Sequence, residues 1–230
     1  MEQAHRLLIP PQRLPRWVDG FALRHGPPSI DVRPTQLTLT AANGAEAVLE
    51  LIWGPLPGLD PLAELFEQVA RPRRLAALLV RKSAHAVGVF EGNDLVAHRL
   101  GRHYVQGRTK AGGWSQQRYA RRREHQAERA YAKAADAAQE VLLPQLGALD
   151  GLVLGGDARA LREVLDVAAL APLAALAERL HRPTLAVPDP NLQVLRDVLP
   201  RFVAVPISVN DMARTNSTLA QHDDQAGQER

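Results

Sequence analysis

The sequence LAALLVRKSAHAVGVFEGNDLVAHRL occupies residues 75–100 and predicts three consecutive β-strands. Leu75–Arg81 has the apolar run of a buried strand. His85–Phe90 pairs naturally with Leu95–Leu100, because Glu91–Asp94 between them has the composition of a turn. These strands are expected to form part of one sheet.

A glycine-rich segment and a long helix follow these strands. Residues 101–114 contain glycine at 101, 107, 112 and 113, so the segment is expected to project as a loop. Residues 115–143 have helical spacing, and Pro144 ends the helix. The apolar residues that mark its buried stripe recur at steps of four and three: Ala127, Tyr131, Ala134, Ala138 and Val141.

Strands and helices alternate in the rest of the chain. Residues 151–154 (GLVL) predict a strand that runs into Gly155-Gly156-Asp157, where Asp157 can cap the next helix. This alternation predicts an α/β fold in which a mixed β-sheet is layered with helices. The further elements expected are helices at 161–170, 172–181 and 191–199 and strands at 184–187 and 202–207.

The first 70 residues are expected to form an extension that packs on the main domain. Residues 1–34 are rich in Pro and Arg and are expected to wrap around that domain rather than form its core. Strands at 35–40 and 47–52 flank Asn43-Gly44, which is a hairpin signal. A short helix is expected at 61–70. The predicted domains are an N-terminal β-hairpin extension at 1–70, a main domain at 71–210 and a disordered tail at 211–230.

Composition narrows the setting in which the protein works. The chain has no cysteine, which excludes disulfides and thiolate metal sites and favours the reducing cytoplasm. Its N-terminal residues do not have the pattern of a secretory signal. Its longest apolar run, residues 167–177, contains Pro172 and is too short to cross a bilayer. A cytoplasmic localisation without a membrane partner is therefore expected.

Positive charge is concentrated in one short segment. The chain has a net charge of +3, yet residues 106–123 contain six basic residues and no acidic one, so the remaining residues together are negative. A solvated helix face usually mixes signs, so the segment favours phosphate binding. The six basic residues are Arg108, Lys110, Arg118, Arg121, Arg122 and Arg123.

The same segment carries the chemistry that can be inferred. Gly112 and Gly113 allow close backbone approach to a crowded site and expose amide donors. Gln116 and Gln117 can each bond a water or a hydroxyl without changing charge. No strong general base is present, so the chemistry should depend on positioning and amide donation. Trp114 could stack on an RNA base or pack back onto the domain.

Residues 106–123 resemble the catalytic loop of the class-1 peptide release factors of eukaryotes and archaea. There, Gly-Gly-Gln and Ser precede Arg-aromatic-Ala-Arg-x-Arg at the start of a long helix. Gly112-Gly113, Ser115, the run Arg118-Tyr119-Ala120-Arg121 and Arg123 fall in that register. The resemblance extends over about residues 75–207. It implies a release-factor middle-domain-like (RNase H-like) fold for the main domain and a catalytic role for it.

The position of the glutamine distinguishes this chain within that pattern. Trp114 stands where release factors place the catalytic Gln, and glutamine follows only at Gln116 and Gln117. A delayed Gln is similar to the Vms-type release-factor-like peptidyl-tRNA hydrolases, in which Gly-Gly-Ser-Gln delays it by one residue. Here Gln116 also follows a Ser but is delayed by two residues, and the overall pattern resembles the actinobacterial branch of that family. This resemblance implies hydrolysis of the ester of peptidyl-tRNA on the ribosomal large subunit, with no cofactor, metal or DNA. By the same resemblance, Gln116 is favoured over Gln117 as the catalytic residue.

Other interpretations remain open at this level. Trp114 and Ser115, together with the six basic residues, are the expected RNA contacts. The alternative function is that of a non-catalytic rescue factor that binds the ribosome or RNA. The histidines His85, His98 and His103 lack the carboxylate cluster of a metal site. Residues 155–157 could bind an anion at a helix N-terminus, although a helix cap is the simpler interpretation. The choice between intact ribosomes and split large subunits stays open, as does the oligomeric state.

Overall fold

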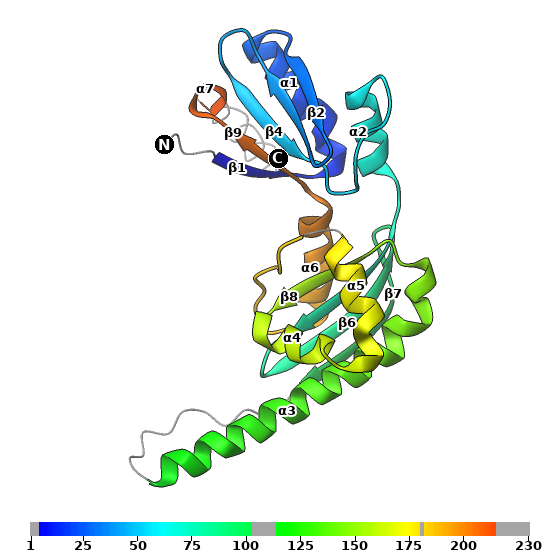
Figure 1. Ribbon diagram of the computed structural model, residues 1–230, viewed down its shortest axis with the longest axis vertical. Helices are drawn as coiled ribbons and strands as arrows, with labels where there is room; N and C mark the ends of the chain where they lie inside the picture. The colour runs from blue at the N-terminus through cyan, green and yellow to red at the C-terminus, as the bar shows by residue number, and fades with distance from the viewer. Residues whose placement is uncertain (1–4, 103–113, 180–181, 215–230) are drawn as a thin grey trace, which may run out of the picture. The chain divides into compact units, whose positions relative to one another are not determined.

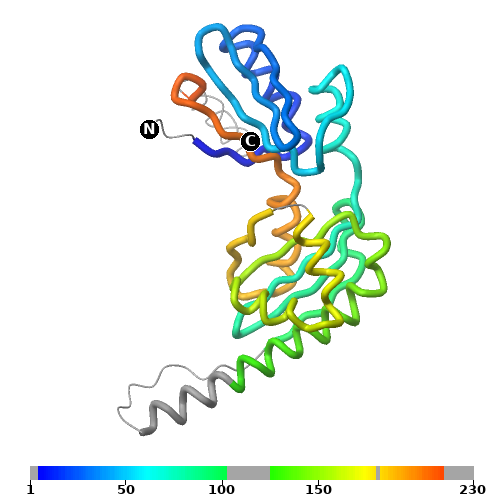
Figure 2. Tube along the Cα trace, viewed as in Figure 1, coloured from blue at the N-terminus to red at the C-terminus, as the bar shows by residue number. Residues whose placement is uncertain are grey.

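The structure is a computed structural model that describes residues 5–102, 114–179 and 182–214, with the backbone alone for residues 114–124 (Figure 2). The chain divides into two compact units. Unit 1 comprises Met1–Arg71 and Val203–Arg230, and unit 2 comprises Pro72–Phe202. Within the described ranges, no helix is both long and apolar enough to span a membrane.

Unit 2 is built on a four-stranded mixed sheet with the order β7-β6-β5-β8 (Figure 1). β6 pairs antiparallel with both of its neighbours, whereas β8 pairs parallel with β5. The three consecutive strands expected from residues 75–100 are confirmed, together with a parallel partner for the first of them. The strands are β5 (Arg74–Val80), β6 (Ala84–Glu91), β7 (Asp94–Arg102) and β8 (Gly151–Gly156).

Helices cover both faces of this sheet, which confirms the predicted α/β fold with a mixed sheet between helices (Figure 1). One face packs against α3, α4 and α5 in a single apolar cluster. The other face packs against α6, and a Cβ built on Gly88 would lie 3.0 Å from a methyl carbon of Leu195. The helices of unit 2 are α3 (Trp114–Leu142), η2 (Leu143–Ala148), α4 (Ala158–Leu165), η3 (Ala168–Leu170), α5 (Ala171–Arg179) and α6 (Leu192–Val203).

The predicted strand at residues 184–187 is wrong. Only one parallel bridge joins Leu185 to Gly155 in this region. Proline at 183 and 188 brackets the segment, and proline cannot donate to a sheet ladder, so too few residues remain for a regular strand.

Unit 1 contains a five-stranded antiparallel sheet with the order β1-β9-β4-β3-β2. The predicted hairpin is confirmed as β3 and β4, and Gly44 in its turn has a φ of 84°. The predicted helix at 61–70 is also confirmed. The elements are β1 (His5–Ile9), η1 (Pro11–Arg13), α1 (Leu14–His25), β2 (Ser29–Arg33), β3 (Gln36–Thr40), β4 (Glu46–Glu50), α2 (Pro61–Ala70), β9 (Val205–Val209) and α7 (Asp211–Arg214).

Two expectations about unit 1 need correction. Residues 1–34 do not merely wrap another domain, because α1 contributes Leu14, Val18 and Phe21 to a buried core. The last strand, expected at 202–207, is β9, and it pairs with β1 and β4 in the sheet of unit 1 rather than with the sheet of the main domain. The first error arose because the helical spacing of apolar residues was overlooked in a Pro- and Arg-rich stretch. The second arose because the strands that pair with β9 lie far away from it in sequence.

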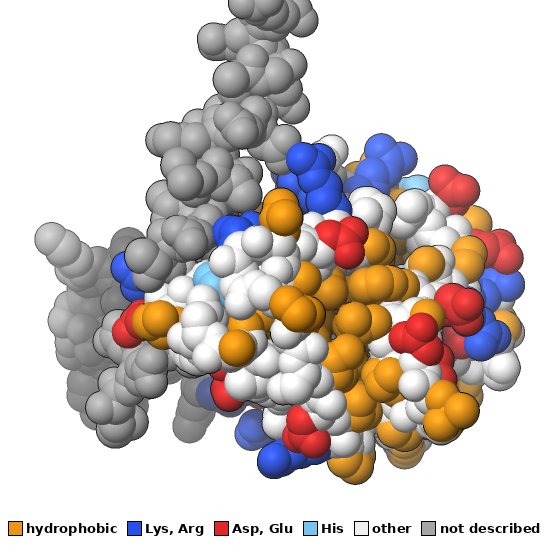
Figure 3. Space-filling view, turned by 90° about the horizontal axis from the view of Figure 1, so that it is seen from above, with side chains coloured by type: hydrophobic (Ala, Val, Ile, Leu, Met, Phe, Trp, Pro, Cys, Tyr) orange, Lys and Arg blue, Asp and Glu red, His pale blue; other side chains and the backbone are white. Residues whose placement is uncertain are grey.

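Some large apolar side chains remain exposed on unit 1, including Leu23 and Leu59. On the face of the molecule in Figure 3, hydrophobic side chains occupy the middle, and Lys and Arg side chains lie mainly toward the margins. That face is therefore not a basic surface of the kind expected for phosphate binding.

Candidate functional site

The candidate site lies between the end of β7 and the start of α3. β7 ends at Arg102 and α3 begins at Trp114. The glycine-rich segment therefore connects an edge strand of the unit 2 sheet to the helix packed on that sheet. Four of the residues predicted to act there lie outside the described residues: Arg108, Lys110, Gly112 and Gly113.

The backbone of the other predicted site residues is helical. Because an α-helix turns about 100° per residue, positions 116 and 117 lie about 100° apart around its axis and are not equivalent. Within α3 the described side chains begin at residue 125, so the contacts of the predicted site side chains lie outside the described part of the chain. These residues occupy the first three turns of α3: Trp114, Ser115, Gln116, Gln117, Arg118, Arg121, Arg122 and Arg123.

The second half of α3 shows where the purely basic segment stops. There, the exposed side of the helix carries both signs of charge. His125 Nδ1 lies 3.0 Å from the Glu128 carboxylate. Further along the helix, the basic Arg129 is followed about two turns later by the acidic Asp136. Since residues 106–123 contain no acid, the start of α3 is purely basic, whereas the rest of the helix is mixed in charge.

A close-packed seam holds α3 on the sheet. Ala130, Ala134 and Ala138 are buried, and their small side chains allow the helix to approach β6 closely. Arg99 of β7 forms an ion pair with Glu140 of α3. The C-terminal half of the helix is therefore fixed to the same strands from which the glycine-rich segment departs.

Tyr131 belongs to the same seam. Its side chain is buried, and burial raises the pKa of its hydroxyl, with the nearby Asp157 and Glu163 carboxylates adding to the effect. Tyr131 is therefore neutral near pH 7, so it adds no charge where the helix meets the sheet.

His85 and Gly101 form a tight contact at the base of the site. His85 is buried at the start of β6 and pairs in register with Gly101 of β7. A Cβ on Gly101 would lie 2.2 Å from the imidazole ring, so only glycine fits under this ring. His98 is exposed and His103 lies outside the described residues. The sequence argued against a metal site at His85, but it did not indicate the contact with Gly101, because register cannot be derived from one strand alone.

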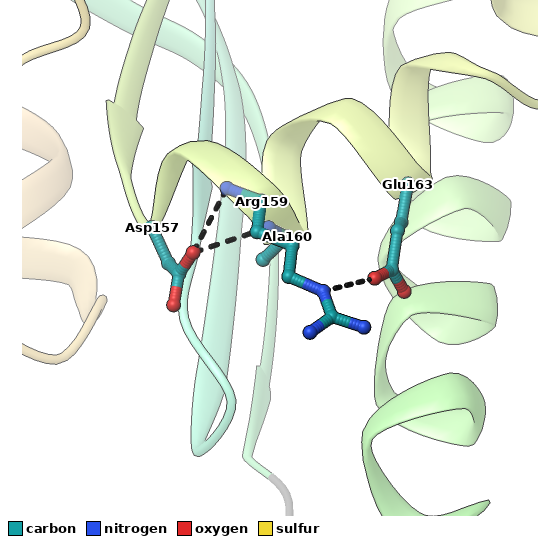
Figure 4. A network of polar contacts seen from close by, with 4 residues as sticks. All are labelled: Asp157, Arg159, Ala160 and Glu163. Carbon is teal, nitrogen blue, oxygen red and sulfur yellow. Dashed lines mark hydrogen bonds and ion pairs between the residues drawn. The ribbon is translucent and has the colours of Figure 1, made fainter. Parts of the chain in front are cut away.

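Asp157 caps α4, as the sequence predicted (Figure 4). Its carboxylate Oδ1 accepts from the backbone N–H groups of Arg159 at 2.9 Å and Ala160 at 3.3 Å. Arg159 in turn bonds Glu163 one turn further on, at 2.9 Å. The helix N-terminus is thus occupied by the chain's own carboxylate, which supports the cap over an anion site.

Replacing Asp157 with Ala should lower the free energy of unfolding by about 0.5–2 kcal/mol, because two backbone donors are left without their acceptor. Chemical denaturation monitored by circular dichroism measures this change. Asp157→Asn keeps an acceptor and should recover most of the loss. Equal losses in both variants would mean that the carboxylate charge, rather than the hydrogen bonds, stabilises α4.

A mixed sheet whose edge strand leads through a glycine-rich basic segment into a long helix is the arrangement expected of a release-factor-like protein. The model of the family described as Actinobacteria/chloroflexi VLRF1 release factor (acVLRF1) matches residues 73–208, which is more than half of the chain. The chain belongs to this family. The match covers most of unit 2 and continues into β9.

Comparison with solved structures gives similar proteins from archaea. The crystal structure of the archaeal translation termination factor aRF1 has a TM-score of 0.44 and 15% identity, over 88% of this chain and 68% of that one. A structure titled "Archaeal protein" has a TM-score of 0.40 and 16% identity, over 70% of this chain and 48% of that one. No curated protein matches the chain.

Proposed function

We propose that the protein is a peptidyl-tRNA hydrolase that frees nascent chains from stalled ribosomal complexes. The observation that carries the proposal is the segment Gly107–Arg123, in which two adjacent glycines lead into a helix start with only basic charge. Membership of a release-factor family supports this, because release from the ribosome is the activity such a name describes. The partners are the ribosomal large subunit and peptidyl-tRNA, in the cytoplasm.

The chemistry needs little from the protein. The ester between peptide and tRNA is labile, so the protein has to place a water near the carbonyl and stabilise the departing hydroxyl of the terminal adenosine. A backbone amide within residues 112–116 supplies the second function. A glutamine side chain, Gln116 or Gln117, helps to position the water. No metal or cofactor enters these steps.

The roles of the neighbouring residues follow from their chemistry. Arginine and lysine bind phosphates, so Arg108, Lys110 and the arginines of the helix start hold the RNA. Trp114 can stack on a base, and Ser115 can bond the RNA backbone. Gly112 and Gly113 let the turn approach the tRNA end.

The deciding experiment measures release of a labelled nascent chain from purified stalled large-subunit complexes. The expected result is multiple turnover by the wild-type protein. A protein that binds these complexes and never frees peptide is instead a non-catalytic rescue factor. Trp114, which occupies the position of the catalytic glutamine in release factors, is the feature that favours this alternative.

Converting Arg121, Arg122 and Arg123 to Glu should weaken binding to large subunits, because the helix start can no longer bind phosphates. The slope of log affinity against log salt should also become shallower, by about 0.7–0.9 for each phosphate that the variant no longer binds. Co-sedimentation at several salt concentrations measures both effects. The control reverses two charges in the mixed-sign half of the same helix, Arg129→Glu with Lys133→Glu, and should change the slope less. An unaltered slope in the triple variant would show that this segment does not bind phosphates.

A further inference from the structure

Two cations outside the sequence motif lie at the end of the unit 2 sheet from which residues 103–113 depart. Lys82 is at the tip of the β5–β6 turn, which is closed by Arg81 N–H donating to Ala84 O at 2.9 Å and Ala84 N–H to Arg81 O at 3.3 Å. Arg102 is the last residue of β7 and pairs in register with Ala84. The ordered ladder thus presents both cations on neighbouring strand ends.

These two cations differ from their neighbours in having no counter-charge. Arg81 lies 3.4 Å from the Asp189 carboxylate, and Arg99 is paired with Glu140. Lys82 and Arg102 are exposed, and no hydrogen bond or ion pair joins either of them to another residue in the described part of the chain. Their charge is therefore available to a partner.

The opposite end of the same sheet has a different charge pattern. There, Arg74 lies among Glu91, Asp94 and Asp150, so both signs are present. With a rise of about 3.3 Å per residue, the nine residues of β7 separate the two ends by about 26 Å. At the end of the sheet where Lys82 and Arg102 lie, Asp157 follows β8, and its carboxylate accepts a hydrogen bond from the backbone N–H of Arg159 in α4. Uncompensated positive charge in this sheet thus lies beside the start of the glycine-rich segment.

We propose that Lys82 and Arg102, at the strand ends next to the start of the glycine-rich segment, form a binding surface for tRNA phosphates. The inference rests on the proposed function in assuming that the partner is RNA. Phosphate contacts fix the register of a protein on RNA without reading sequence. A strand end and a two-residue turn offer such contacts with less loss of backbone freedom than a loop.

The test measures binding of fluorescently labelled deacylated tRNA to the full-length protein over a range of salt concentrations. Lys82→Glu with Arg102→Glu should weaken binding and reduce the slope of log affinity against log salt by about 1.4–1.8, as expected for two phosphate contacts. The matched control is Arg196→Glu, an exposed cation on α6, which covers the face of the sheet opposite to α3. Arg196→Glu should leave the slope unchanged, and circular dichroism should be the same for all variants.

An unchanged slope in the double variant would overturn the proposal, as would an equal change from Arg196→Glu, which would reveal only an effect of net charge. Weaker binding to large subunits without weaker binding to tRNA would assign the cations to the ribosome, through its RNA or its proteins, and would also overturn the proposal of a tRNA contact. The release assay is read separately. If the wild-type protein binds tRNA through these cations but frees no peptide, the proposed function is refuted and the phosphate-binding surface is supported. If release is normal and the slope of the double variant is unchanged, the surface is refuted and the proposed function is supported.

Discussion

Replacing Gln116 with Ala should slow release of the nascent chain by about a hundredfold, which is about 2.7 kcal/mol of transition-state stabilisation. Gln117→Ala should cost less. Gln116 follows Ser115 directly, as the glutamine does in the pattern that the sequence resembles. Because consecutive helical positions lie about 100° apart, one glutamine cannot simply take the place of the other.

The measurement is single-turnover release of labelled peptide from purified stalled large-subunit complexes, with each single variant and the double variant. Residual release by the double variant should remain above background, since backbone amide donation survives the substitutions. Gln139→Ala, near the other end of the same helix, is the matched control and should leave the rate unchanged. Greater damage from Gln117→Ala would reverse the residue assignment. Full release by the double variant would show that neither glutamine takes part in the reaction.

Local sequence patterns were sufficient for the elements of unit 2 that frame the site. Apolar residues recur with a period of about two in the strands at residues 75–100 and of 3.6 in the helix after residue 114. Each of these elements packs through its apolar face against elements that are close to it in sequence. The cap at Asp157 follows from one side chain and two backbone donors close to it in the chain. These features depend on contacts within a few residues, so one sequence specifies them.

Long-range pairing was not predictable in the same way. β9 lies more than 150 residues from its partner β4, and nothing in its apolar run says which of two sheets it completes. The contact of His85 with Gly101 requires the exact register of β6 on β7, and a shift of one residue would put the ring on the other face. The charge at Lys82 and Arg102 was overlooked for the same reason, because 20 residues of sequence separate cations that the sheet brings to one end.

Replacing Gly112 or Gly113 with Val should reduce release at least about tenfold, or about 1.4 kcal/mol of transition-state stabilisation, with little change in melting temperature. A β-branched side chain restricts φ and ψ and adds bulk where the backbone must come close to the tRNA terminus. Stability should be unaffected, since the glycine-rich sequence of this segment is typical of a projecting loop, which has little core to lose. The same release assay, with thermal unfolding measured in parallel, separates the two effects. Gly147→Val is the control, because an added Cβ there meets no atom within 4 Å. Full activity in both loop variants would show that the glycines serve only as a linker, and a large fall in melting temperature would show that they belong to the folded core.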